Sequence, residues 1–199
     1  MTMTVSPAPA FADPVLGSQE TFRAALHAMS YPGRLLEAGF DLVPPAPLHK
    51  ATAALALALF DFETPIWLDR TGATENVRAF LKFHCGCPVV EDPAAAQFAI
   101  VTDAETMPSL DCFNAGTHEA PETAATVILQ VSRFIAGSDG LKLTGPGIEK
   151  ERVVLIDGVP RSFWKTRAAV VEGFPCGIDL FLTEDHRLTG LPRTTRIAS

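Results

Sequence analysis

Residues 126–134, TVILQVSRF, form a nearly continuous apolar run, and no other part of the sequence limits the fold more. A strand with one face in water would alternate apolar and polar side chains, whereas this run shows little alternation. Such a pattern is typical of a strand covered on both faces. The run therefore predicts a sheet that lies between two other layers.

Apolar periodicity elsewhere predicts helices and strands that alternate along the chain. Helices are expected from a cap at Ser18 to a stop at residues 31–33, over 48–60, from a cap at Thr74 to Gly86, and over 163–171. Strands are expected over 34–40, 66–68, 97–102, 126–134, 141–144, 152–156, 178–182 and 193–197. Because hairpin-length spacings appear late in the chain, the order favours a layered α/β fold with a mixed β-sheet flanked by helices.

The length and composition fit one domain. The chain has 199 residues, of which 47% are apolar, and it shows no repeat and no long linker. Residues 1–12, MTMTVSPAPAFA, are rich in Pro, Ala, Ser and Thr and predict a mobile lead-in. Residues 13–199 are expected to form a single α/β domain.

Charge and hydropathy narrow the class of protein further. The formal net charge of −7 disfavours nucleic-acid binding, which needs a basic face. The longest apolar run, residues 51–60, is shorter than the roughly 20 residues of a membrane span, so it predicts a buried helix and no membrane association. No basic start followed by an apolar segment indicates export, so we expect a cytoplasmic protein with reduced thiols. Residues 133–199 hold 10 basic and 8 acidic side chains, so an anion-facing side is expected there.

The string His84-Cys85-Gly86-Cys87 offers an imidazole and two thiols, which suit zinc or a redox couple. A structural zinc site needs four ligands, and the remaining thiols, Cys112 and Cys176, are single. The spacing is also not the Cys-x-x-Cys of redox proteins. A packed histidine with two half-buried thiols is therefore favoured, and no metal is expected.

A glycine-rich turn, Leu143-Thr144-Gly145-Pro146-Gly147-Ile148, could present backbone N–H groups to a phosphate. Pro146 removes one of these donors, and no Gly-Lys-Ser/Thr follows. A structural turn is the favoured reading, and anion binding at Gly145 and Gly147 is the alternative.

Asp179 interrupts the apolar segment Ile178–Leu182, where a lone carboxylate is costly unless it is paired. Arg193 and Arg196 follow closely and could pair with it or hold an anion. A structural ion pair is favoured over an anion clamp. Neither G-x-S-x-G nor G-x-G-x-x-G occurs, so no catalytic residue is identified.

Several segments in order resemble the PhnH family, the H subunit of the bacterial carbon–phosphorus lyase system. The opening residues carry Asp13-Pro14-Val15, Gln19, Phe22-Arg23, Leu26, Ala28-Met29-Ser30 and Pro32-Gly33. The later segments are Thr64–Leu68, Arg78 with Phe83-His84, Ala124–Val131, Leu143–Ile148, and Phe174-Pro175 and Gly177–Leu180 with Leu191–Thr195. The resemblance covers about residues 13–197.

This resemblance implies a subunit that works with the G, I and J subunits in the use of alkylphosphonates. The assembly displaces adenine from ATP with a phosphonate to give ribose 1-phosphonate 5-triphosphate. The resemblance also implies a fold similar to pyridoxal-phosphate-dependent transferases without that cofactor. A large apolar surface is expected on the isolated chain, covered by partner subunits or, when the chain is alone, by a homodimer. A mainly architectural role is expected, with anion-binding or catalytic residues of its own as the alternative.

Overall fold

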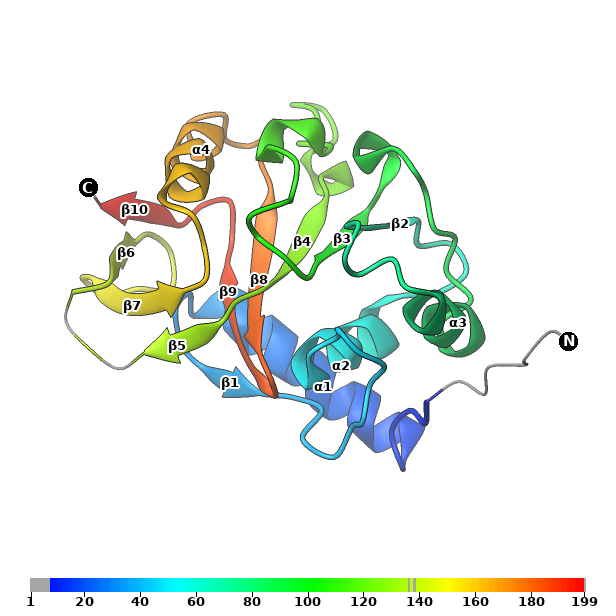
Figure 1. The fold of residues 1–199 in the computed structure, drawn as a ribbon. Helices are drawn as coiled ribbons and strands as arrows, with labels where there is room; N and C mark the ends of the chain where they lie inside the picture. The colour runs from blue at the N-terminus through cyan, green and yellow to red at the C-terminus, as the bar shows by residue number, and fades with distance from the viewer. Residues whose placement is uncertain (1–7, 136, 138, 199) are drawn as a thin grey trace, which may run out of the picture.

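The computed structural model describes residues 8–135, 137 and 139–198 (Figure 1). Residues 1–7, the larger part of the predicted lead-in, lie outside the described residues. The residues that follow them rest on the folded chain. The carbonyl oxygen of Ala8 accepts a hydrogen bond of 2.8 Å from His84 Nε2, and Phe11 packs against the core.

Six strands form the main sheet, in the spatial order β1-β9-β8-β4-β3-β2. Their bounds are β1 (Leu36–Glu37), β2 (Ile66–Leu68), β3 (Phe98–Val101), β4 (Thr126–Gln130), β8 (Asp179–Glu184) and β9 (Arg187–Leu191). β2, β3, β4 and β8 are parallel, whereas β9 pairs antiparallel with β8 and β1 pairs antiparallel with β9. The sheet is therefore mixed, with its parallel strands in the middle and at the β2 edge.

A second, antiparallel sheet packs at the β9 end of the molecule, where Figure 1 shows it to the left. It contains β5 (Arg133–Ile135), β6 (Leu141–Thr144), β7 (Arg152–Asp157) and β10 (Arg196–Ala198), in the order β10-β6-β7-β5. The apolar run 126–134 is thus divided between two sheets. Its first part is β4, but the chain leaves the main sheet at Ser132, whose N–H donates to Asp157 of β7.

Among the described residues, four α-helices accompany the sheets: α1 (Pro14–Ser30), α2 (Lys50–Leu59), α3 (Glu75–His84) and α4 (Arg161–Val171). Three short 3-10 helices lie in the connections, at Pro93–Ala95, Leu110–Cys112 and Pro121–Thr123. The predicted cap at Thr74 is confirmed, since its side chain accepts from the N–H of Val77. The predicted cap at Ser18 is wrong. α1 is capped at Asp13 instead, because the Asp13 carboxylate accepts from two backbone N–H groups and Pro14 suits the first helical turn.

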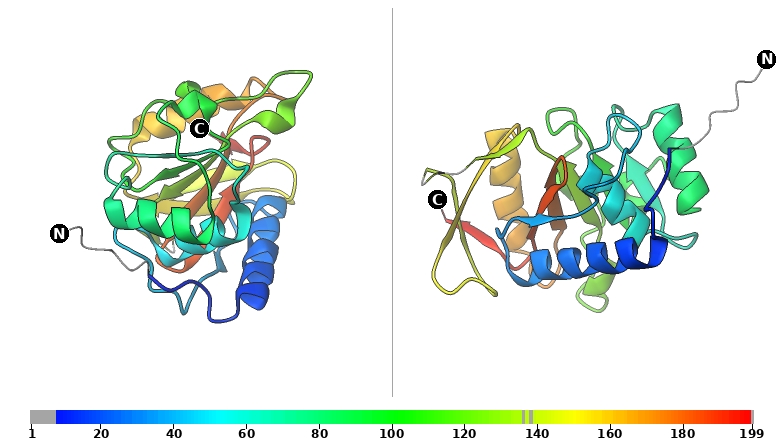
Figure 2. Two further views of the ribbon diagram at one scale, coloured as in Figure 1. Left: turned by 90° about the vertical axis from the view of Figure 1, so that its right-hand side faces the viewer. Right: turned by 90° about the horizontal axis from the view of Figure 1, so that it is seen from below.

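Alternate residues of the central strands face opposite layers. Ile128 and Phe181 pack with α1, α2 and α3, whereas Val127 and Leu180 pack toward α4 and the second sheet. Figure 2 shows α1 extended along the molecule beside the main sheet. β4, which is the first half of the apolar run, is therefore covered on both faces, as the pattern of that run predicts.

Two further differences concern the end of the chain. The strand β9 was not predicted, because it follows β8 after a tight turn at Asp185 and His186 and reads as part of a loop. The last strand begins at Arg196, not at Arg193, which lies in a turn. Among the described residues, no helix is long and apolar enough to cross a membrane.

Candidate functional site

Asp179 and Arg193, which the sequence singled out, form an ion pair at the amino end of β8. The carboxylate of Asp179 accepts from the backbone N–H of Arg193 at 2.7 Å, from Nε at 3.2 Å and from Nη2 at 2.6 Å. Only 22% of the Asp179 side chain and 15% of the Arg193 side chain are exposed. The carboxylate is thus satisfied within the chain, as a half-buried acid needs to be.

The third guanidinium nitrogen of Arg193 connects two loops. Nη1 donates to the carbonyl oxygen of Pro121 at 2.6 Å and to that of Pro175 at 3.4 Å. The loop that contains Pro175 also packs closely on this side chain, since a Cβ on Gly177 would lie 3.1 Å from the Cβ of Arg193. All three guanidinium nitrogens therefore donate to groups of the chain itself, which is the geometry of the structural ion pair.

Both glycines of the glycine-rich turn stand where another backbone segment approaches. A Cβ on Gly145 would lie 2.8 Å from the carbonyl oxygen of Thr194, and one on Gly147 would lie 2.0 Å from that of Ser30. Their φ angles, 134° and 80°, are also unfavourable for side chains. These contacts match the reading as a structural turn, and they press the turn against residues 192–195 and the end of α1.

Arg196, the fifth candidate, does not join this group. Its side chain is exposed, and its backbone pairs with Thr144 in the neighbouring strand β6. The structure therefore brings together Asp179, Arg193 and Gly145 around residues 192–195, which we call the 192–195 turn. Gly147 and Arg196 lie outside this cluster.

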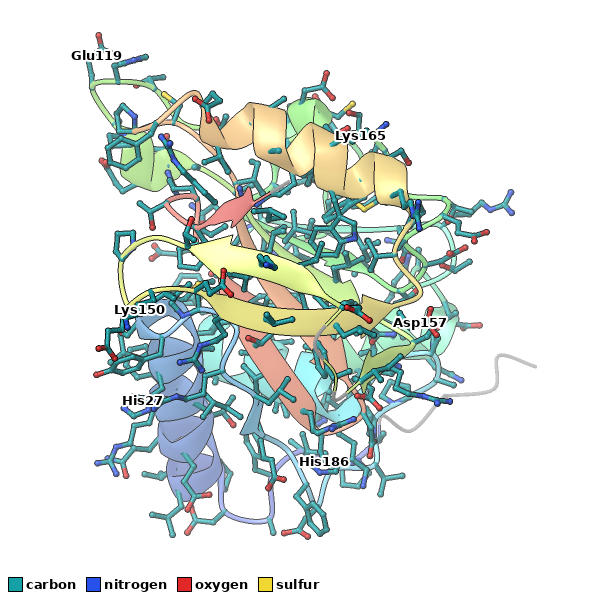
Figure 3. The ribbon with its side chains drawn as sticks, turned by 90° about the vertical axis from the view of Figure 1, so that its left-hand side faces the viewer. His27, Glu119, Lys150, Asp157, Lys165 and His186 are labelled. Atoms are coloured by element: carbon teal, nitrogen blue, oxygen red, sulfur yellow. The ribbon has the colours of Figure 1, made fainter. Side chains whose placement is uncertain are left out.

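Arg167 of α4 is the residue that the sequence analysis missed. It is 1% exposed and lies below the 192–195 turn, where Nη2 donates to the carbonyl oxygens of Pro192 at 2.6 Å and Leu191 at 3.4 Å. A signal was present in the sequence, because Phe163, Arg167 and Val171 recur at four-residue spacing and share the buried face of α4. Lys165 of the same helix points outward (Figure 3).

The string His84–Cys87 lies at the end of α3. His84 Nε2 bonds to the carbonyl oxygen of Ala8, and the imidazole ring packs at a tilt against the ring of Phe80. The Cys85 thiol donates to the carbonyl oxygen of Ala56 at 3.6 Å. The interaction between the two neighbouring thiols raises the pKa of Cys85 and lowers that of Cys87. Within the described part of the chain, no three His, Cys, Asp or Glu side chains are placed to hold a metal ion.

The carboxyl ends of the parallel strands, where α/β proteins commonly bind ligands, are filled by the chain's own polar groups. After β2, buried Asp69 accepts from Thr71, Thr102 and the N–H of Gly72. At the end of β4, the Gln130 side chain bonds to Pro47 and to the N–H of His49. These groups bind one another and leave little capacity for a ligand at this edge.

An open apolar groove of about 330 Å³ lies at the opposite edge of the sheet, between the second half of α1 and the amino ends of β3, β4 and β8. It is lined by Phe22, Ala25, Leu26, Met29, Leu59, Phe98, Thr126, Asp179, Phe181 and Pro192. Phe22 and Leu26 are 53% and 55% exposed, although both are apolar. An apolar surface of this kind is typical of a contact between proteins.

These features define a mixed α/β protein with an internal ion-pair cluster and an exposed apolar groove, and with no recognisable catalytic constellation among the residues described. The chain belongs to the PhnH family: the family model for the bacterial phosphonate metabolism protein PhnH matches residues 9–198. The resemblance predicted from the sequence motifs is thereby confirmed.

Two curated proteins are similar over nearly the whole chain. One is the alpha-D-ribose 1-methylphosphonate 5-triphosphate synthase subunit PhnH of Rhizobium meliloti (strain 1021), which is 35% identical over 188 residues, 94% of each chain. The other is the putative C-P lyase subunit protein HtxG of Stutzerimonas stutzeri, which is 34% identical over 184 residues, 90% of this chain and 85% of the relative.

Proposed function

We propose that this chain is a subunit of a carbon–phosphorus lyase assembly that makes ribose 1-phosphonate 5-triphosphate from ATP and an alkylphosphonate. The family match and the two relatives, both described as subunits, support this role. We further propose that its partners are the G, I and J subunits, that it works in the cytoplasm, and that it forms a homodimer when alone.

The main support for an architectural role is the hydrogen bonding of the Arg193 guanidinium group. Its three guanidinium nitrogens all donate to Asp179, Pro121 or Pro175, so the most conspicuous charged cluster holds the fold together. An active-site arginine would instead direct donors toward the substrate. The exposed apolar groove supports the same role, because a partner subunit would cover it.

The fold would then resemble that of a pyridoxal-phosphate-dependent transferase that works without the cofactor. This likeness is a proposal from the sequence resemblance. The absence of the cofactor is tested by the absorbance of the purified chain incubated with pyridoxal phosphate, before and after borohydride. A reduced, covalently held pyridoxyl group would contradict it.

The main proposal is tested by co-expression with the other subunits. The isolated chain should release no adenine from ATP with methylphosphonate, whereas the assembly should contain the chain and release adenine. Turnover by the isolated chain at an enzyme-like rate would contradict an architectural role. Failure of the chain to enter the assembly would contradict membership itself.

The groove is tested by replacing one of its exposed residues. Phe22→Glu should weaken entry into the assembly, because it places a charge on the apolar surface, while leaving the unfolding midpoint of the isolated chain unchanged. Phe62→Glu is the matched control, since Phe62 is 74% exposed and does not line the groove. Normal assembly of the Phe22 variant would place the contact elsewhere.

A further inference from the structure

Arg167 is a buried cation whose hydrogen-bonding capacity is only partly used. Nη2 donates to the 192–195 turn and to Leu191, but Nε and Nη1 have no hydrogen-bond partner among the described residues. At 1% exposure, these N–H groups cannot be satisfied by bulk water. Buried donors without a partner are costly, and a charged donor costs more than a neutral one.

A second unused group lies at the same turn. The Thr195 hydroxyl, on a side chain that is 1% exposed, also has no partner in the part of the chain that is described. The two residues are neighbours in space, because the Pro192 carbonyl oxygen accepts both from Arg167 Nη2 at 2.6 Å and from the N–H of Thr195 at 2.8 Å. Two residues with unused polar groups therefore share the Pro192 carbonyl oxygen as an acceptor.

The charges at this place do not balance. Asp179 is the nearby carboxylate that favours the charged form of Arg167, but its oxygens are occupied by Arg193. Two guanidinium groups thus share one carboxylate, and a positive charge is left over. Burial lowers the pKa of Arg167 to about 10, so the side chain still carries its charge at neutral pH.

We propose that Arg167 and Thr195 form an internal site for a tetrahedral oxyanion, the group that phosphate and phosphonates share. Guanidinium groups bind such oxygens strongly, and a threonine hydroxyl supplies a further donor. A water molecule would satisfy the donors but leave the surplus charge, whereas an oxyanion meets both needs. This inference concerns the isolated chain and does not depend on its place in an assembly.

The position of the turn decides how an anion would enter. Pro192 lines the apolar groove, while its carbonyl oxygen faces Arg167, so the 192–195 turn separates the groove from the site. Gly145 and Asp179 contact this turn from the other sides. Entry requires the turn to move, and binding is therefore expected to be slow as well as saturable.

The experiment measures anion binding to the isolated full-length chain. The protein is purified without phosphate, and phosphate retained from the cell is assayed after acid unfolding. Inorganic phosphate and methylphosphonate are then titrated separately at constant ionic strength, with chloride as the balancing salt. The readouts are equilibrium dialysis and the thermal unfolding midpoint. One saturable site per chain is expected, with a midpoint that rises as the site fills.

Three variants locate the site. Arg167→Met should weaken oxyanion binding by at least about tenfold, because it removes the charge and the unused donors. Thr195→Val should weaken binding by roughly threefold to tenfold while keeping the shape of the side chain. Arg196→Met is the matched control, since it removes an exposed guanidinium next to Thr195 in sequence, and its binding should equal that of the unaltered chain.

The outcomes are decisive in each direction. No saturable binding by the unaltered chain, or equal binding by Arg167→Met, would overturn the proposal and assign the unused donors to internal water. If Arg167→Met does not fold, Thr195→Val decides by the same comparison with Arg196→Met. Preference for phosphate or for methylphosphonate tells which source of the oxyanion the site takes.

Discussion

Arg193 binds Asp179 twice over, through its backbone N–H and through its guanidinium group, and so joins the amino end of β8 to the turn that follows β9. The remaining nitrogen of the same side chain reaches the carbonyl oxygens of two loops. One residue therefore fixes the relative positions of four backbone segments at the edge of the main sheet.

Removing this side chain should destabilise the protein. Arg193→Ala keeps the backbone N–H bond to Asp179 but removes the guanidinium donors from this mostly buried carboxylate and from two carbonyl oxygens, so the free energy of unfolding should fall by about 2–4 kcal/mol. Urea unfolding followed by circular dichroism measures the change. Arg196→Ala, an exposed arginine three residues later, should change the value by less than about 0.5 kcal/mol. Equal effects of the two substitutions would show that the ion pair contributes little.

A methyl group at Gly147 should be poorly tolerated. Its Cβ would lie 2.0 Å from the carbonyl oxygen of Ser30, and its φ of 80° is strained for alanine, so Gly147→Ala should cost about 3 kcal/mol or more. Gly137→Ala is the control, because its Cβ would meet only Leu155 at 3.5 Å, an ordinary contact. Thermal unfolding midpoints of the two variants compare them directly, and a stable Gly147 variant would argue against the close approach of the turn to α1.

Asp185 should make stability depend on acid pH. A hydrogen bond from His186 holds the pKa of the Asp185 carboxyl below its usual value of 3.8, with Lys50 and His49 adding to the effect. The contribution is present above the unfolded-state pKa and is lost as the pH falls through the lower folded-state pKa. The stability difference between the unaltered chain and Asp185→Asn should therefore be constant at neutral pH, begin to shrink as the pH falls to about 4, and vanish only below the folded-state pKa of Asp185.

Asparagine is the suitable replacement here, because Asp185 has a φ of 47° and asparagine tolerates that region. Denaturant unfolding at a series of pH values from neutral to acid provides the measurement. A difference between the two proteins that persists unchanged to the lowest pH would assign it to something other than the carboxylate charge.

Elemental analysis of the chain purified without chelator should find no stoichiometric zinc or iron. His84 is bonded to Ala8, and the described residues contain no cluster of three ligands at the end of α3. Replacing both Cys85 and Cys87 with serine should therefore leave the metal content unchanged. A stoichiometric metal that is present in the unaltered chain and absent from the double variant would show that Cys85 and Cys87 bind it.

Elements of the fold were predictable from the sequence where the signal lies within a few neighbouring residues. The strand over residues 66–68 and the helix that starts after Thr74 are found where they were predicted, because apolar periodicity and a side-chain cap act within a few residues. The start of α1 was misplaced, since Asp13 and Ser18 are both good caps and the helix uses Asp13, which is followed by Pro14 in the first turn.

Residue types and their order were enough to identify the family, the apolar β4 segment and the requirement of Asp179 for a cationic partner. The tertiary structure selects the arginine that pairs with Asp179. Arg193 and Arg196 lie only three residues apart, and the 192–195 turn directs Arg193 toward β8. The tertiary structure also decided the division of residues 126–135 between two sheets and the burial of Arg167, because both depend on segments distant in sequence that meet only in the folded chain.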